Sequence, residues 1–156
     1  MIRSTAQDLG APGWDPYFGF GRIDAQKATQ AAGPAPILAV NHEQMLFLAD
    51  ATTGPWPQTL LVSNGAPCAS LDWIASESED WLDANPDTGQ ASSSQPGEVA
   101  VSVDKAGLST GTSYNTTLTI DSSTIGILET PQLVDVKFVY SDTPLTRTFF
   151  PLGMGH

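Results

Sequence analysis

The stretch LVDVKFVY (133–140) alternates apolar and polar side chains, which is typical of a strand with one buried face. The expected buried face consists of Val134, Val136, Phe138 and Tyr140. EVAVSVD (98–104) shows the same alternation, and TSYNTTLTID (112–121) shows it more weakly. A period of two in three separate stretches indicates a β-sheet protein with one buried face on each sheet.

Shorter apolar runs extend this pattern toward the N-terminal side. They are LAVN (38–41), QMLFLA (44–49), QTLLVSN (58–64), ASLDWIAS (69–76) and a short WLDA (81–84). The polar run 86–97 is expected to be a loop. Seven or eight short strands joined by close turns predict a mainly β fold, an antiparallel β-sandwich.

The first 32 residues differ from this pattern. Ile2 to Leu9 has the tail of a helical pattern, and a Gly- and aromatic-rich stretch follows. AQKATQAA (25–32) predicts a short helix with Asp24 as its N-cap. GPAP at 33–36 would end this helix and form a stiff linker. The predicted domains are therefore an N-terminal unit (1–32), a linker (33–36), a sandwich (37–141) and a C-terminal tail (142–156).

Composition excludes some partners. Seventeen acidic residues against six basic ones give a net charge of −11, so nucleic acid and anionic membranes are not expected to bind. No apolar run approaches the ~20 residues that span a bilayer. Cys68 is the single cysteine, which excludes an intrachain disulfide and predicts a buried or half-buried thiol. The N-terminus has no signal-peptide pattern, so a signal would lie upstream if the parent protein is secreted.

The stretch STAQDLGAPGWDPYFGFGRIDAQKAT (4–29) resembles the C-terminal end of the subtilisin-like serine protease catalytic domain. Ser4-Thr5-Ala6, Asp8-Leu9-Gly10 and Arg22-Ile23-Asp24-Ala25 match the phrases that close that domain in the family. The resemblance implies that residues 1–32 are the remnant of a catalytic domain. It also implies a secreted, extracellular parent serine endopeptidase, whose upstream catalytic domain would be a partner.

Residues 37–141 resemble a second family, the BACON domain. The phrases that carry the resemblance are LFLADATTGPWPQTLLVSNGA (46–66), LDWIASESEDWLDANPDTGQ (71–90), VAVSVDKAGLSTGTSYNTTLTIDS (99–122) and VDVKFVYSD (134–142). The resemblance implies an immunoglobulin-like β-sandwich of the kind attached to extracellular bacterial hydrolases. It also implies one of two roles, binding of a carbohydrate such as a mucin glycan, or separation of domains as a spacer.

The sequence does not supply a catalytic site. Ser113 in GTS, Asp87 in DTG and His42 superficially suggest a serine protease triad. However, Tyr-Asn-Thr follows Ser113 where the subtilisin nucleophile motif has Met-Ala-x-Pro, and the chain order is His, Asp, Ser. All three residues also follow the stretch that resembles the end of the catalytic domain. We therefore predict that this chain is not an enzyme and has no catalytic residues.

Metal and cofactor sites are not predicted either. His42 and His156 are far apart in the sequence. An acidic stretch could hold calcium through its oxygen ligands, but it lacks the spacing of a calcium-binding loop, which favours a solvated loop; its members are Glu77, Glu79, Asp80 and Asp83.

Aromatic side chains are the best candidates for ligand contact. Trp56 lies in a turn before a strand, and Tyr114 lies near the start of a strand, so both are predicted as ligand-binding residues. Trp73 and Trp81 match positions that would be core in a sandwich and are expected there, while Trp14 should pack within the N-terminal unit.

The sequence thus predicts a non-catalytic accessory domain of a secreted subtilisin-like protease. The domain would act as a spacer or docking module. The alternative is a carbohydrate-binding module that directs the protease to a glycan, and an exposed cluster of aromatic and polar side chains would favour this alternative.

Overall fold

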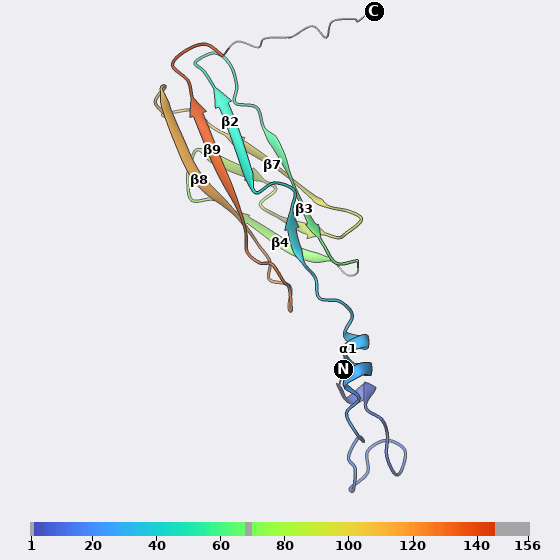
Figure 1. Ribbon diagram of the computed structural model, residues 1–156. Helices are drawn as coiled ribbons and strands as arrows, with labels where there is room; N and C mark the ends of the chain where they lie inside the picture. Colours follow the sequence, from blue (N-terminus) through green and yellow to red (C-terminus); the bar gives the residue numbers. More distant parts are fainter. Residues whose placement is uncertain (1, 68–69, 146–156) are drawn as a thin grey trace, which may run out of the picture.

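A computed structural model describes residues 2–67 and 70–145, and shows a β-sandwich with a small N-terminal unit at one end (Figure 1). Within these residues there are a 3-10 helix, η1 (Ile2–Thr5), one α-helix, α1 (Ala25–Ala32), and nine strands. The strands are β1 (Leu38–Val40), β2 (Gln44–Ala49), β3 (Gln58–Asn64), β4 (Leu71–Ser76), β5 (Leu82–Asn85), β6 (Thr88–Ala91), β7 (Gly97–Val103), β8 (Thr112–Asp121) and β9 (Gln132–Tyr140). The predicted fold class, a mainly β sandwich, is confirmed.

The strands form two sheets with the orders β1-β3-β7-β5 and β2-β9-β8-β4-β6. The chain crosses from the first sheet to the second between residues 40 and 44, after β1 and before β2. In the first sheet β1 pairs antiparallel with β3, whereas in the second β2 runs parallel to β9. The prediction of an all-antiparallel sandwich was therefore wrong for this one pair. This crossing brings β2 alongside β9 in the same direction. The alternation of apolar residues is the same in parallel and antiparallel strands, so it could not predict the direction of β2 relative to β9.

The predicted loop at 86–97 contains one further strand, β6, which raises the number of strands from the predicted seven or eight to nine. This strand pairs with β4 in a register that places Gly89 opposite Trp73. A short, polar edge strand lacks apolar alternation, since only Ala91 of its four residues is buried. The sequence therefore gave no periodic signal for it.

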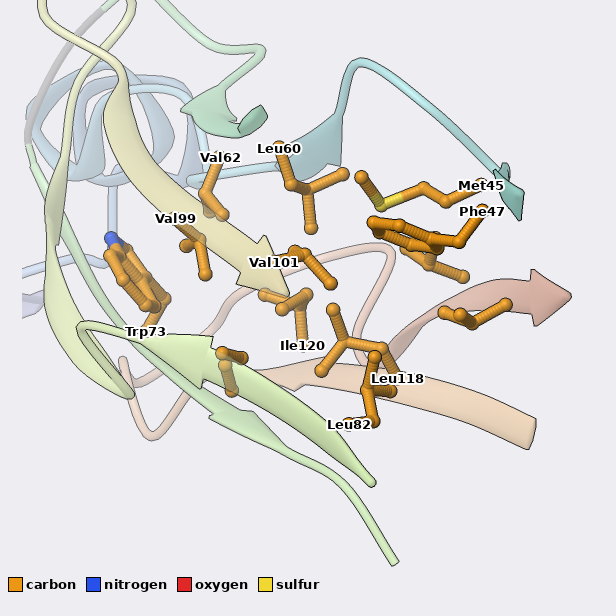
Figure 2. Packing of buried hydrophobic residues seen from close by; sticks show 14 of the residues in the cluster. Met45, Phe47, Leu60, Val62, Trp73, Leu82, Val99, Val101, Leu118 and Ile120 are labelled. Atoms are coloured by element: carbon orange, nitrogen blue, oxygen red, sulfur yellow. The ribbon is translucent and has the colours of Figure 1, made fainter. Parts of the chain in front are cut away.

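The core lies between the two sheets and is formed by the alternating apolar positions (Figure 2). Trp73 and Trp81 are both buried, as predicted. The indole of Trp73 packs against the backbone of two strands, because methyl groups added to Gly89 and Gly97 would lie 2.5 and 2.6 Å from its ring atoms. Glycine at these two positions makes room for the largest side chain of the core.

The N-terminal unit is closed by local contacts. Gln7 and Arg22 form an antiparallel bridge, and the Asp15 carboxylate accepts hydrogen bonds of 2.8 Å from the backbone N–H groups of Tyr17 and Phe18. The Asp24 carboxylate accepts from Lys27 N at 2.9 Å, which confirms the predicted N-cap of α1. The helical pattern expected from Ile2 to Leu9 is a single turn of 3-10 helix.

Packing of Trp14 within the N-terminal unit was predicted, and this prediction was wrong: the side chain is 63% exposed. Among the described residues of the unit, Asp15 is the only buried one, so they form no core that could take large side chains. Seven large apolar residues of the unit are exposed to 36% or more: Ile2, Leu9, Trp14, Tyr17, Phe18, Phe20 and Ile23.

The chain enters the sandwich through a fixed segment. Leu38 N donates to Leu128 O at 3.0 Å, and Leu128 N donates to Pro36 O at 2.9 Å. On the other side, Ile37 N donates to the Asn64 side-chain oxygen at 2.9 Å. These bonds hold residues 36–38 between Leu128 and the end of β3, at the point where the predicted linker ends. Cys68 and residues 146–156 lie outside the described residues, so the predictions for the thiol and for most of the tail are not addressed.

Candidate functional site

The outer face of the sheet β2-β9-β8 carries an open hollow of about 710 Å³. Its outward-facing lining comes from three neighbouring strands, two residues from each: Gln44 and Leu46 from β2, Asp135 and Lys137 from β9, and Asn115 and Thr117 from β8. We call this set the outer-face hollow. Its volume lies within the range of about 300–1,000 Å³ that is usual for small-molecule sites.

Strand register arranges these side chains in two rows across the sheet. One row contains Gln44, Asp135 and Thr117, and the next contains Leu46, Lys137 and Asn115. Rows of residues on one face of a sheet are roughly 7 Å apart, and three strands span roughly 10 Å. The arrangement brings together side chains of four polar chemistries, an amide, a hydroxyl, a carboxylate and an ammonium, beside one apolar group. This combination can hydrogen-bond a polyhydroxylated ligand at several points.

Trp56 lies in the loop that follows β2, the edge strand of the sheet that carries this hollow. Gln58, two residues further on, donates from its side-chain amide to Leu46 O at 2.7 Å. A methyl group added to Gly54 would lie 2.6 Å from Leu48 O and 3.4 Å from the Trp56 ring. The Trp56 side chain is 55% exposed. Leu46 and Leu48 are also exposed, so an apolar border lies along the β2 edge.

The loop that carries Trp56 is held by Asp50, which is buried. Its carboxylate accepts from Leu145 N at 2.7 Å, and from the N–H groups of Thr52 and Thr53 at 2.7 and 2.6 Å. These hydrogen bonds, with that from Leu145 foremost, hold the pKa of Asp50 far below its usual range. A charged Asp50 thereby fixes the turn that leads from β2 to Trp56.

Tyr114, the second predicted contact residue, lies on the inner face and apart from Trp56. Its ring stacks on Phe138 with a centroid distance of 6.0 Å and lies 6.1 Å from the Trp81 ring. Its hydroxyl accepts from Ser109 N at 2.8 Å. Both the ring and the hydroxyl are thus engaged in packing and loop closure. Ligand contact by Tyr114 stays a prediction, and this geometry does not bring it to the outer-face hollow.

The strand that contains Ser113 begins one residue earlier, at Thr112, as the period-two pattern predicted. Among the described residues, no group of three or more His, Cys, Asp or Glu side chains could hold a metal ion. In residues 2–67 and 70–145, no helix has the length and apolar character to cross a membrane.

Comparison with known families decides the classification of the sandwich. Residues 40–131, more than half of the chain, match the family described as the viral BACON domain. The chain belongs to the viral BACON domain family. The predicted BACON resemblance is thereby confirmed, and the matched segment runs from the end of β1 to the loop before β9. No curated protein sequence matches the chain.

Solved structures with the same fold include proteins of several kinds. A predicted carbohydrate-binding protein of Bacteroides ovatus has a TM-score of 0.55 and 15% identity, with 68% of this chain and 37% of that chain covered. The Escherichia coli chaperone DraB has a TM-score of 0.52 and 8% identity, with 67% and 56% covered. The Pseudomonas aeruginosa chaperone CupB2 has a TM-score of 0.51 and 16% identity, with 66% and 55% covered.

At these identities the structural likeness concerns the fold alone. The BACON chain spans little more than a third of the Bacteroides ovatus protein and just over half of each chaperone.

Sequence reasoning proposed Trp56 as a contact residue but did not propose the polar residues of the outer-face hollow. The alternation in β9 places Asp135 and Lys137 on the face opposite the apolar one. This alternation is the signal from which their outward position could have been predicted. Their neighbours on β2 and β8 depend on the strand order β2-β9-β8, which brings together segments about 90 residues apart. The hollow is therefore a product of topology.

Proposed function

We propose that this BACON domain is a non-catalytic, carbohydrate-binding accessory module. Its binding site is the outer-face hollow, with Trp56 at the border. The observation that carries the proposal is the gathering of two rows of outward polar side chains in an open hollow, together with an exposed indole in the loop that follows the neighbouring edge strand β2. This is the exposed aromatic and polar cluster that distinguishes a binding module from a spacer.

The chemistry of a sugar suits this arrangement. A sugar ring presents C–H groups on its faces and hydroxyl groups around its edge. The faces can pack on Trp56 and Leu46, because aromatic and aliphatic side chains gain from covering apolar surface. The hydroxyl groups can exchange hydrogen bonds with Asn115, Asp135 and Gln44, which offer both donors and acceptors. The hollow is open, so a chain of several sugars can lie across it.

The N-terminal unit supports a proposal about the context of the module. Its exposed apolar side chains need a covering surface, since exposed clusters of this kind mark contact sites. The resemblance of residues 1–32 to the end of a subtilisin-like catalytic domain favours the rest of such a domain as that surface. We propose on this basis that the module belongs to an extracellular subtilisin-like protease, and that it holds the protease near a glycan.

A spacer is the second candidate function, and the entry segment favours it. Residues 36–38 are held by hydrogen bonds to Leu128 and Asn64, so the direction in which the preceding chain leaves the sandwich is fixed. A rigid exit would keep an upstream domain at a defined distance from whatever lies beyond the module.

A glycan array separates the two functions. The purified chain is compared with Trp56→Ala, with Asn115→Ala and with Trp14→Ala as the matched control. Trp14 is as exposed as Trp56 but belongs to the N-terminal unit. We expect binding by the unmodified chain and by the control, and a loss of roughly five- to tenfold in both hollow variants.

Two results would overturn the proposal. Absence of binding to every glycan would leave the spacer function. Binding that survives both hollow substitutions would place the site elsewhere on the sandwich. Circular dichroism and the melting temperature of each variant show whether a loss of binding reflects a loss of fold.

A further inference from the structure

The sandwich contains few cationic side chains. Between residues 37 and 145, the cationic side chains are Lys105 and Lys137. Lys105 is committed to the fold: its ammonium donates to Asp50 O at 3.1 Å and lies 5.9 Å from the centroid of the Tyr140 ring. Lys137 makes no ion pair within 4.0 Å among the described residues, where the ion pair found is that of Lys27 with Asp24. The ammonium of Lys137 thus carries a positive charge that no carboxylate of the described residues neutralises within 4.0 Å.

The position of Lys137 is central to the outer-face hollow. It lies on β9, the middle strand of the three, with Leu46 on one side and Asn115 on the other. Asp135 faces the same way one row along, roughly 7 Å distant by strand geometry. The row of Lys137 therefore offers ammonium and amide N–H donors, while the row of Asp135 offers acceptors for hydroxyl groups.

Charge gives this donor row a selective role. The protein has a net charge of −11, so at long range it repels anions, and a single lysine does not reverse that field. Within the screening distance of about 8 Å at physiological salt, a local cation can still dominate the interaction with one anionic group. A ligand that brings a carboxylate into this row gains most from Lys137, because it adds the attraction between opposite charges to the hydrogen bond that a neutral hydroxyl could also accept.

We infer that the outer-face hollow selects glycans that carry a carboxylate, which binds in the row of Lys137 and Asn115. This inference rests on the proposed carbohydrate-binding function and names the class of sugar that the site prefers. Uronic acids and sialic acids share the required chemistry, a carboxylate attached to a hydroxylated ring.

The test uses pairs of ligands that differ in the acidic group. Titration calorimetry compares oligogalacturonate with its methyl ester, and sialyllactose with lactose. In at least one of the two pairs, we expect the acidic ligand to bind roughly five- to tenfold more tightly than its neutral partner. Lys137→Gln should abolish that difference, and Lys137→Arg should retain it because the charge is kept.

Two further variants control for net charge. Lys27→Gln changes the total charge by the same amount as Lys137→Gln, but Lys27 lies in the N-terminal unit, where it pairs with Asp24. It should leave the ratio of acidic to neutral binding unchanged. Asp135→Asn removes a negative charge that repels the carboxylate of the ligand, so it should strengthen binding of the acidic ligand.

The outcomes separate this inference from the function on which it rests. Equal binding of acidic and neutral members, or a preference that persists in Lys137→Gln, overturns the inference and leaves carbohydrate binding intact. Absence of binding for both members of both pairs, together with a negative glycan array, overturns both.

Discussion

Substitution of Gly97 by alanine tests the packing of Trp73 between the two sheets. A methyl group at this position would lie 2.6 Å from the indole Nε1 and 3.0 Å from two ring carbons. The ring has little room to withdraw, because Gly89 of β6 approaches it as closely and the side chain is only 2% exposed. The added methyl must therefore displace the indole or separate the strands.

The expected loss of stability combines two opposing terms. Overpacking in a filled core costs about 1–3 kcal/mol, and the lack of room around Trp73 places this site near the upper limit. Replacing glycine inside a strand returns about 0.5–1 kcal/mol by restricting the unfolded chain. The net loss is about 2 kcal/mol, which at about 4 °C per kcal/mol lowers the melting temperature by about 8 °C.

Thermal and urea denaturation, followed by tryptophan fluorescence and circular dichroism, would measure this loss. Gly65→Ala is the matched control, since Gly65 has no positive φ and its added methyl would meet Ile37 at an ordinary 3.5 Å. The control should remain within about 0.5 kcal/mol of the unmodified protein. If Gly97→Ala proved as stable as Gly65→Ala, the close approach of β7 to the indole would be refuted.

Three further predictions concern residues around the site and in the N-terminal unit. The lowered pKa of Asp50 means that its contribution to stability is full above about pH 4 and is lost as the pH falls below that value, so Asp50→Asn should lower the melting temperature at neutral pH and reduce its decline in acid; an unchanged acid decline would contradict this. Tyr114→Phe removes the hydroxyl that accepts from Ser109 N, so it should cost about 1 kcal/mol in urea denaturation and leave glycan affinity unchanged; a loss of affinity would return Tyr114 to the binding site. Asp15→Ala removes two hydrogen bonds of the N-terminal unit, so it should speed proteolysis there without moving the melting temperature of the sandwich; a lower melting temperature would show that the two parts are coupled.

Alternation of apolar side chains was sufficient to predict the sandwich and most of its strands. It succeeded for β7 and β9, where one face of each strand is buried and every second residue is apolar. It failed for β6, whose polar residues form an edge strand, and it could not reveal that β2 runs parallel to β9. Both features depend on partners distant in the sequence, and a period of two is the same for parallel and antiparallel pairs.

The candidate site was predicted only at its aromatic border. Trp56 was identifiable because a large aromatic residue between two prolines in a turn is hard to bury. Tyr114 is also a large aromatic residue, yet its ring stacks on Phe138 against the core. What separates the two residues is their place in the fold, because Trp56 lies in an exposed loop and Tyr114 on the inner face of β8. The polar rows around Lys137 likewise exist only once β2, β9 and β8 are side by side.

The most direct test of carbohydrate binding at the outer-face hollow is a nuclear magnetic resonance titration with a glycan selected on the array. The side-chain amides of Gln44 and Asn115 and the indole N–H of Trp56 report on the hollow and its border, and the indole of Trp14 serves as a reference. The account predicts saturable shifts for the first three signals and none for Trp14. Shifts confined to other parts of the sandwich, or no shifts at saturating glycan, would contradict it.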